Sequence, residues 1–181
     1  GKSYSENPVP FQVIADHIRM LSFSIADGGM PGNEGRGYVL RRILRRAARF
    51  GRILDQREPF IYNLVESLGN VMGDIFPEVV EKRSHIEKVI KAEESSFNDT
   101  LDRGLNHFDK VLKNISGKII SGKEAFRLYD TYGFSLDLTQ LMAKEKGLNV
   151  DEKGFIDAMS EQKQRAKAAG KFTAETKVLE W

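Results

Sequence analysis

Apolar residues recur at steps of three and four along most of this chain, a spacing typical of amphipathic α-helices. In the first such segment the recurring positions are Phe11, Ile14, Ile18, Leu21 and Ile25. They predict a helix over about residues 10–26 that stops at a pair of glycines. A second helix is expected to end at a cap on Gly51, and a third to run from Pro59 through Met72 with an inward face of Phe60, Leu64, Leu68 and Val71.

The longest periodic segment runs from Glu78 to about Ile115. Its apolar stripe consists of Ile86, Ile90, Phe97, Leu101, Phe108, Val111 and Ile115. A single helix of that extent would reach about 55 Å at about 1.5 Å per residue. Gly104 interrupts the stripe and is expected to bend it, and two shorter helices are the alternative.

The last third of the chain is more broken. The stretch between Gly117 and Gly122 has room for a very short strand, and Ser121 with Glu124 has the spacing of a capping box. Asp137 and Asp151 are expected to cap two further helices, the last reaching about Ala169.

These patterns predict an all-α fold, with at most a very short strand pair, in which a long helix braces two lobes. The predicted lobes are residues 1–76 and 77–175, followed by a tail at 176–181.

Composition narrows the functional classes. The chain has 181 residues, of which 40% are hydrophobic and 30% charged, with a formal net charge of +2. It has no cysteine, which excludes disulfides and thiolate sites. No apolar run approaches the roughly 20 residues of a membrane span. We therefore expect a cytoplasmic protein without a membrane partner.

Charge is concentrated on the second helix. A helical projection places six arginines within about 140° of one another. We call them the arginine face: Arg41, Arg42, Arg45, Arg46, Arg49 and Arg52. No Asp or Glu is interleaved to pair with them, so another partner must neutralise the charge. Nucleic acid, an acidic protein surface and tertiary salt bridges within the chain are the three possibilities.

A glycine loop precedes this helix. Residues 27–37, DGGMPGNEGRG, contain five glycines and a proline, which no helix or strand interior would tolerate. Such a loop can direct main-chain N–H groups at a phosphate, or it can be a rigid corner between two helices. Its spacing matches neither a P-loop nor a dinucleotide fingerprint.

Catalytic chemistry is not evident from the residues. No nucleophile and base, carboxylate pair or set of metal ligands has suitable spacing, so no catalytic and no metal residue is predicted. The chain by itself is typical of a binding surface. Asn33 in the glycine loop and Asp130 in an aromatic turn are the polar side chains best placed to confer selectivity.

Two long motifs indicate a family. The first comprises DHIR at 16–19, IADG at 25–28, Pro31, Asn33, RGYVLRRI at 36–43 and RRA at 45–47, and the second is AFRLYDTYGF at 125–134. In order and separation these motifs closely resemble alanyl-tRNA synthetase. The resemblance covers nearly the whole chain and corresponds to the helical tRNA-recognition region that follows the class II catalytic domain.

The resemblance implies a role for specific residues. Asn33 and Asp130 are expected to read a G·U wobble pair in the acceptor stem of tRNA(Ala). The RNA backbone is expected to bind Arg36 and five residues of the arginine face, namely Arg41, Arg42, Arg45, Arg46 and Arg49. Recognition would also require Asn33 and Asp130, nearly 100 residues apart, to line one cleft, with the long helix bringing them together.

The resemblance also implies what this fragment lacks. The ATP-dependent attachment of alanine, with Mg²⁺, is expected on a catalytic domain of the same polypeptide, and zinc on an editing domain. No cofactor is expected in the fragment itself. The alternative is a helical adaptor module that binds an acidic protein surface.

Overall fold

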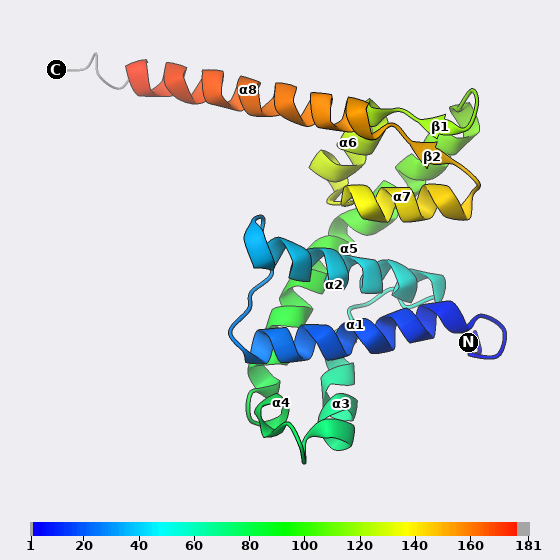
Figure 1. Cartoon of the computed structure of the whole chain (residues 1–181), viewed down its shortest axis with the longest axis vertical. Helices are drawn as coiled ribbons and strands as arrows, with labels where there is room; N and C mark the ends of the chain where they lie inside the picture. The colour runs from blue at the N-terminus through cyan, green and yellow to red at the C-terminus, as the bar shows by residue number, and fades with distance from the viewer. Residues whose placement is uncertain (1, 177–181) are drawn as a thin grey trace. The chain divides into compact units, whose positions relative to one another are not determined.

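The computed structural model describes the backbone of residues 2–176 and the side chains of residues 2–166. Its elements in chain order are α1 (Pro8–Ala26), α2 (Gly35–Ile53), the 3₁₀ turn η1 (Ile61–Asn63), α3 (Leu64–Met72), α4 (Pro77–Glu81), α5 (Arg83–Asn114), β1 (Ile119–Ile120), α6 (Gly122–Tyr132), α7 (Leu136–Glu145), β2 (Asn149–Val150) and α8 (Glu152–Thr176) (Figure 1). The all-α prediction with a very short strand pair is confirmed. Most of the predicted tail lies outside the described residues.

The chain divides into two compact units, residues 1–103 and 104–181. The division falls inside α5, which contributes its first part to one unit and its last part to the other. The boundary predicted at residues 76 and 77 coincides with the start of α4, and the division into lobes 1–76 and 77–175 stays a prediction. No helix among the described residues has the length and apolar content needed to cross a membrane.

In the first unit α1 and α2 lie side by side (Figure 1). The predicted inward residues Leu21 and Ile25 of α1 are buried, as are Leu44 and Ala47 of α2. The cap predicted at Gly51 is wrong, because α2 continues to Ile53. Glycine is required there for a different reason: a Cβ at this position would collide with the ring of Phe60.

The third helix differs in phase from the prediction. A 3₁₀ turn, with three residues per turn, precedes α3 and rotates the inward face relative to a continuous α-helix from Pro59. Val65 is therefore fully buried, and Val71, predicted to face inward, is 82% exposed.

The long helix begins later than predicted. Lys82 separates α4 from α5, so the segment predicted to start at Glu78 forms one short and one long helix. From Ile86 to Phe108 the predicted stripe is buried. Gly104 does not end the helix: it allows the Phe134 ring to pack directly on the α5 backbone, where a Cβ would overlap it.

The second unit contains the only strand pair among the described residues. β1 pairs in parallel with β2, with Ile119 opposite Asn149. The capping prediction at Ser121 is confirmed, since its Oγ accepts a hydrogen bond from the Glu124 N–H at 3.3 Å. Asp151 likewise accepts from the Gly154 N–H at 2.9 Å.

The cap predicted at Asp137 is wrong. α7 begins at Leu136 with Ser135 as its N-cap, which places Asp137 within the first helical turn. A carboxylate in that turn interacts favourably with the helix dipole instead of capping the end.

Candidate nucleic-acid interface

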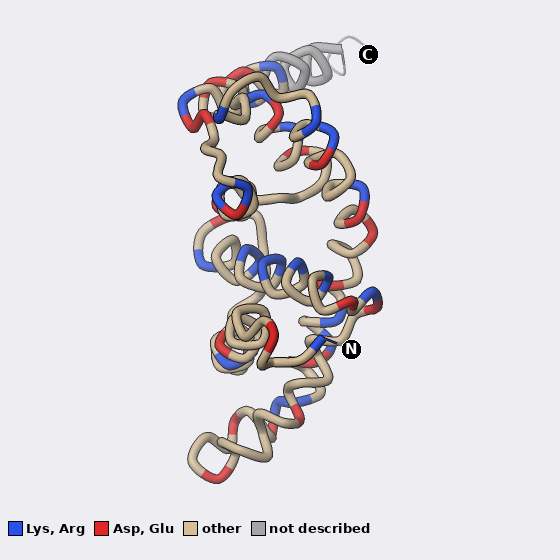
Figure 2. Tube along the Cα trace, turned by 90° about the vertical axis from the view of Figure 1, so that its right-hand side faces the viewer, with Lys and Arg blue, Asp and Glu red and all other residues tan. Residues whose placement is uncertain are grey.

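The arginine face exists as predicted, on a single helix of the first unit. Figure 2 shows basic positions recurring along α2, which contains no acidic residue. The helix is amphipathic, with Leu40, Leu44 and Ala47 buried on its other side. The arginines lie on the side of α2 opposite these residues, and neutralisation of their charge depends on other segments or on a ligand.

Glu93 of α5 neutralises part of this charge. Its Oε1 accepts hydrogen bonds from Nε and Nη2 of Arg45 at 2.9 and 2.8 Å. The same oxygen lies 3.0 Å from Nε of Arg41, in an ion pair whose geometry falls short of a hydrogen bond. Only 10% of the Glu93 side chain is exposed. Tertiary salt bridges, one of the three possibilities open from sequence, thus account for Arg41 and Arg45.

The remaining arginines of the face have different surroundings. Arg52 pairs with Asp102 of α5 at 2.9 Å. Arg49 is buried, with its guanidinium 5.1 Å from the centre of the Phe50 ring. Arg42 lies over the ring of Tyr38 at 5.7 Å. The arginines of the face therefore differ in solvent exposure, and Arg49 is the least accessible of the residues predicted to bind RNA backbone.

Arg36 lies one turn before the arginine face, in the first turn of α2. Its side chain is exposed and has no hydrogen bond or ion pair with another described side chain. With Asp27 and Gly29 it lines a pocket of about 340 Å³, whose floor is formed by Met20 and Leu40. Among the residues predicted to contact phosphate, Arg36 is the most exposed, since the others are half-buried or, for Arg49, buried.

The glycine loop is folded on itself. The Gly32 N–H donates to the Gly37 carbonyl at 2.9 Å, and the Gly28 and Gly29 N–H groups donate to carbonyls of α1. A Cβ on Gly37 would lie 3.0 Å from the Gly32 nitrogen, so only glycine permits this approach. Because these amides are used within the chain, the geometry favours a rigid corner over a phosphate cradle.

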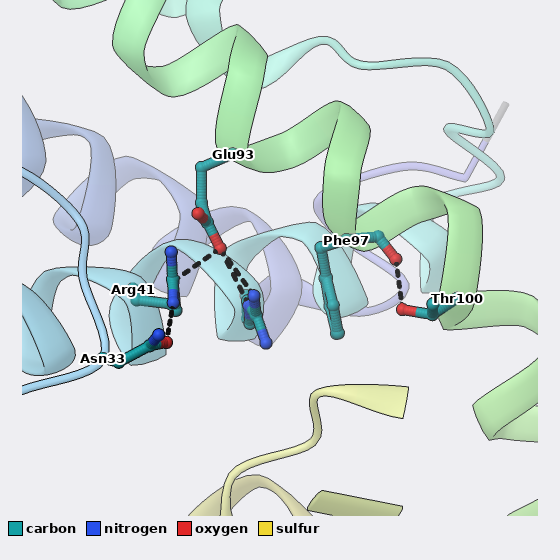
Figure 3. Close-up of polar contacts among 6 residues, drawn as sticks. Asn33, Arg41, Glu93, Phe97 and Thr100 are labelled. Atoms are coloured by element: carbon teal, nitrogen blue, oxygen red, sulfur yellow. Dashed lines mark hydrogen bonds and ion pairs between the residues drawn. The ribbon is translucent and has the colours of Figure 1, made fainter. Parts of the chain in front are cut away.

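Asn33 lies exposed at the end of this corner. Its Oδ1 accepts a hydrogen bond from Nη1 of Arg41 (Figure 3). Arginine has no acceptor atom, so the atom of the Asn33 amide that faces it must be the oxygen. The amide nitrogen is then left as a donor on the other side. Figure 3 shows Arg41 between Asn33 and Glu93.

His17 of α1 lies close enough to Arg46 of the arginine face to sense its charge. Burial, and secondarily the charge of Arg46, lowers the pKa of His17, while Asp16 opposes the shift. The Asp16 carboxylate lies 3.7 Å from Nδ1 of His17. The imidazole is therefore held neutral next to the arginines and adds no charge to the surface. No cluster of side chains suited to a metal ion occurs among the described residues.

Asp130 is presented by the second unit, in the last turn of α6. Its neighbours anchor the turn: Leu128 is fully buried, and the Tyr129 ring packs edge to face with Phe155 at 5.6 Å. Gly133 ends the helix with a φ of 74°. The Asp130 carboxylate itself is exposed and has no ion pair or hydrogen bond within the described part of the chain. The Asp130 carboxylate is therefore a hydrogen-bond acceptor on a turn that its buried neighbours hold in place.

Asn33 and Asp130 thus belong to different compact units. The structure brings Asn33 together with Arg41, and it holds each of the two residues predicted to confer selectivity within its own unit. That Asn33 and Asp130 line one cleft stays a prediction.

Sequence reasoning missed Glu93 and its neighbour Glu94. A signal for them was present, because both occupy the helical steps between Ile90 and Phe97 where the apolar stripe of α5 should continue. Acidic residues at inward positions are rarely buried unless they are paired. Two carboxylates there should have indicated buried partners, of which the arginine face was the obvious one.

Comparison with known proteins gives a consistent assignment. The sequence matches the family described as tRNA synthetases class II (A) over residues 2–180. It is 50% identical over 173 residues to the alanine–tRNA ligase of Streptococcus mutans, and the matched region covers 93% of this chain and 20% of that protein. It is 52% identical over 182 residues to the alanine–tRNA ligase of Chlorobaculum tepidum, covering 98% and 21%. The chain spans about a fifth of the length of these curated relatives.

Proposed function

Because the chain belongs to the class II tRNA synthetase family, we propose that it binds the acceptor stem of tRNA(Ala) and reads a G·U wobble pair there. The observation that carries this proposal is the presentation of Asn33: an exposed amide, fixed by Arg41 at the end of a rigid corner and next to the arginine face.

The proposed target is the minor groove of the stem. An A-form helix has a deep, narrow major groove that side chains cannot read, whereas its minor groove is wide and displays 2′-hydroxyls and base edges. Purine N3 and pyrimidine O2 are acceptors in that groove, and the guanine 2-amino group is a donor. In a wobble pair this amino group has no pairing partner.

Asn33 and Asp130 complement these groups. The exposed Asp130 carboxylate can accept from the guanine amino group, because an ionised carboxylate is purely an acceptor. The Asn33 amide can donate from Nδ2, since its Oδ1 is occupied by Arg41. In a Watson–Crick G·C pair the guanine amino group donates to cytosine, so fewer of its hydrogens are available to Asp130.

The arginines would supply affinity without sequence information. Lys and Arg contacts to phosphate dominate nucleic-acid affinity and make it depend on salt. Arg36 is the best placed of them because it is exposed and unpaired among the described side chains. Arg42, Arg46 and Arg49 complete the proposed contact set. Arg41 and Arg45 already share Glu93, and a smaller part of their charge is available to RNA.

Alanine attachment is proposed to take place elsewhere on a longer polypeptide. The relatives of which this chain spans a fifth are alanine–tRNA ligases. In that arrangement the present region positions the acceptor stem, and a neighbouring catalytic domain using ATP and Mg²⁺ performs the transfer. In this proposal ATP and Mg²⁺ bind to that domain and not to the residues described here.

A salt titration of binding to an acceptor-stem hairpin tests the proposal. With three or more phosphate contacts, log K should fall with log salt with a slope of at least about −2. The hairpin with G·U should bind more tightly than the same hairpin with G·C. Absence of RNA binding at low salt would refute the proposal and leave the adaptor for an acidic protein as the better interpretation of α2.

A further inference from the structure

We propose that Glu93 is a positioning residue for base-pair recognition: through Arg41 it holds the Asn33 amide in the orientation that reads the wobble pair. This inference rests on the function proposed above. It assigns a role to Glu93, which is not among the residues proposed there to contact RNA.

The contacts form a continuous chain from α5 to the glycine loop. Glu93 lies 3.0 Å from Nε of Arg41, and Nη1 of Arg41 donates to Oδ1 of Asn33 (Figure 3). One guanidinium therefore contacts both side chains through different nitrogens. Since a guanidinium is planar and rigid, fixing its Nε edge also fixes the direction of its Nη1 donor.

Glu93 is itself held firmly on its other side. Arg45 contacts its Oε1 through two nitrogens, at 2.9 and 2.8 Å. The Arg45 guanidinium in turn lies 5.1 Å from the centre of the Phe97 ring, which is 1% exposed. Glu93 and Phe97 are separated by one turn of α5, so helix, carboxylate and both arginines form one rigid support.

This support matters because Asn33 has little else to orient it. The residue is exposed, and Arg41 is its one hydrogen-bond partner among the described side chains. A free asparagine amide can present either its oxygen or its nitrogen to a base. With Arg41 in place, the oxygen is engaged and the nitrogen faces outward as a donor. Loss of Glu93 would release Arg41, and Asn33 would then present both atoms.

The charges also distinguish positioning from phosphate binding. Glu93 offsets one of the two positive charges of Arg41 and Arg45, and both guanidiniums are largely covered, with 23% and 18% of their side chains exposed. A residue whose task was to attract phosphate would be poorly served by a carboxylate at 3.0 Å. The same carboxylate is required if Arg41 is to hold Asn33.

The experiment compares Glu93→Ala with Glu87→Ala. Glu87 is a control on the same helix, where it pairs with Arg83 at 2.6 Å. Binding is measured to G·U and G·C hairpins over a salt series. For Glu93→Ala we expect the G·U preference to fall about tenfold, as we also expect for Asn33→Ala, with a salt slope no shallower than that of wild type. The Glu87 variant should retain the wild-type preference. Glu93→Gln, which keeps an acceptor oxygen, should retain part of it.

A double-mutant cycle provides the decisive comparison. If Glu93 acts through Asn33, the preference of Asn33→Ala/Glu93→Ala equals that of either single variant. Additive losses, or a wild-type preference in Glu93→Ala, would overturn the inference. Failure of the wild-type protein itself to prefer G·U would instead refute the function on which it rests.

Arg41→Met keeps the test valid if Glu93→Ala does not fold, because Glu93 remains paired with Arg45 in it. We expect loss of the G·U preference with at most a small change in salt slope. Equal weakening of both hairpins, with a slope reduced by about one, would identify Arg41 as a phosphate contact and contradict the inference.

Discussion

The carboxylate of Glu94 accepts a hydrogen bond from the main-chain N–H of Ile61 at 3.0 Å. Its other oxygen accepts from the Phe60 N–H at the same distance. Glu94 is 1% exposed, so a buried side chain of α5 satisfies both amides at the start of η1. This arrangement joins the connector after α2 to the long helix that carries Glu93.

Glu94→Ala should destabilise the first unit by about 2–4 kcal/mol, because it leaves two N–H groups without their acceptor in a buried site. Chemical denaturation followed by circular dichroism measures the change. Asp99→Ala, at an exposed position on the same helix, is the control and should change stability by less than about 0.5 kcal/mol. Similar losses in the two variants would contradict the assigned role of Glu94.

The same residue makes stability depend on pH. Burial raises the pKa of Glu94 from 4.5 to about 7, against the opposing effects of the Phe60 and Ile61 N–H groups and of the Arg52 charge. Between these values the folded protein holds a proton that the unfolded chain has released. This contribution is therefore fully present below about pH 4.5 and is lost as pH rises through about 7, up to about 3 kcal/mol.

Glu94→Gln isolates that contribution. His17, with its lowered pKa, has the opposite sign, since its unfolded form binds the extra proton. The pH dependence due to His17 cancels in the difference in unfolding free energy between wild type and Glu94→Gln. Between pH 5 and 8 this difference should change by about 2–3 kcal/mol, on the order of 100-fold in the equilibrium constant, with wild type relatively less stable at high pH. A pH-independent difference would show that Glu94 does not titrate in this range.

Gly104→Ala should destabilise the second unit by about 1–3 kcal/mol through overpacking. The added Cβ would overlap the ring of Phe134, which is fully buried, and would lie 3.0 Å from Cβ of Tyr132. Thermal unfolding measures the effect. Gly69→Ala is the matched helical control: its Cβ would meet only Val80, at 3.5 Å, and the substitution should be neutral or stabilising by up to about 1 kcal/mol.

The sequence was sufficient for what local periodicity and capping determine. The extent of α1 and the buried residues from Ile86 to Phe108 follow from side-chain spacing, and the Ser121 cap at the start of α6 from a short motif. The parallel pairing of β1 with β2 could not be predicted, because it joins segments about 30 residues apart and has a two-residue register. The inward face of α3 was misplaced because a 3₁₀ turn shifts its phase.

For the candidate site, the sequence supplied candidate residues but not their partners within the chain. Asn33, Asp130 and the arginine face were predicted from residue type and resemblance. That Arg41 would contact Asn33 and Glu93 together depends on α5 crossing α2 at one particular position, which helical spacing alone does not determine. Part of the charge on α2 is therefore neutralised within the chain, which is one of the three possibilities that the sequence had left open.

Arg36→Ala should weaken binding to G·U and G·C hairpins alike and reduce the salt slope by about one, because a phosphate contact carries no base information. The measurement is a fluorescence titration at several salt concentrations. Arg57→Ala removes an arginine that is 74% exposed outside the arginine face and should leave both affinities unchanged. A selective loss for one hairpin would instead indicate that Arg36 contacts a base.

The central claim is that Asp130 and Asn33 read the minor-groove edge of one G·U pair, and replacing its guanine with hypoxanthine tests this most directly. Hypoxanthine lacks only the 2-amino group. Wild-type protein should bind the substituted hairpin more weakly by about 1–3 kcal/mol. Asp130→Ala should bind both hairpins equally, whereas Asn33→Ala should still distinguish them, since its proposed partner is an acceptor. If Asp130→Ala discriminates between the two hairpins as strongly as wild type, Asp130 does not read the guanine amino group and the account is contradicted.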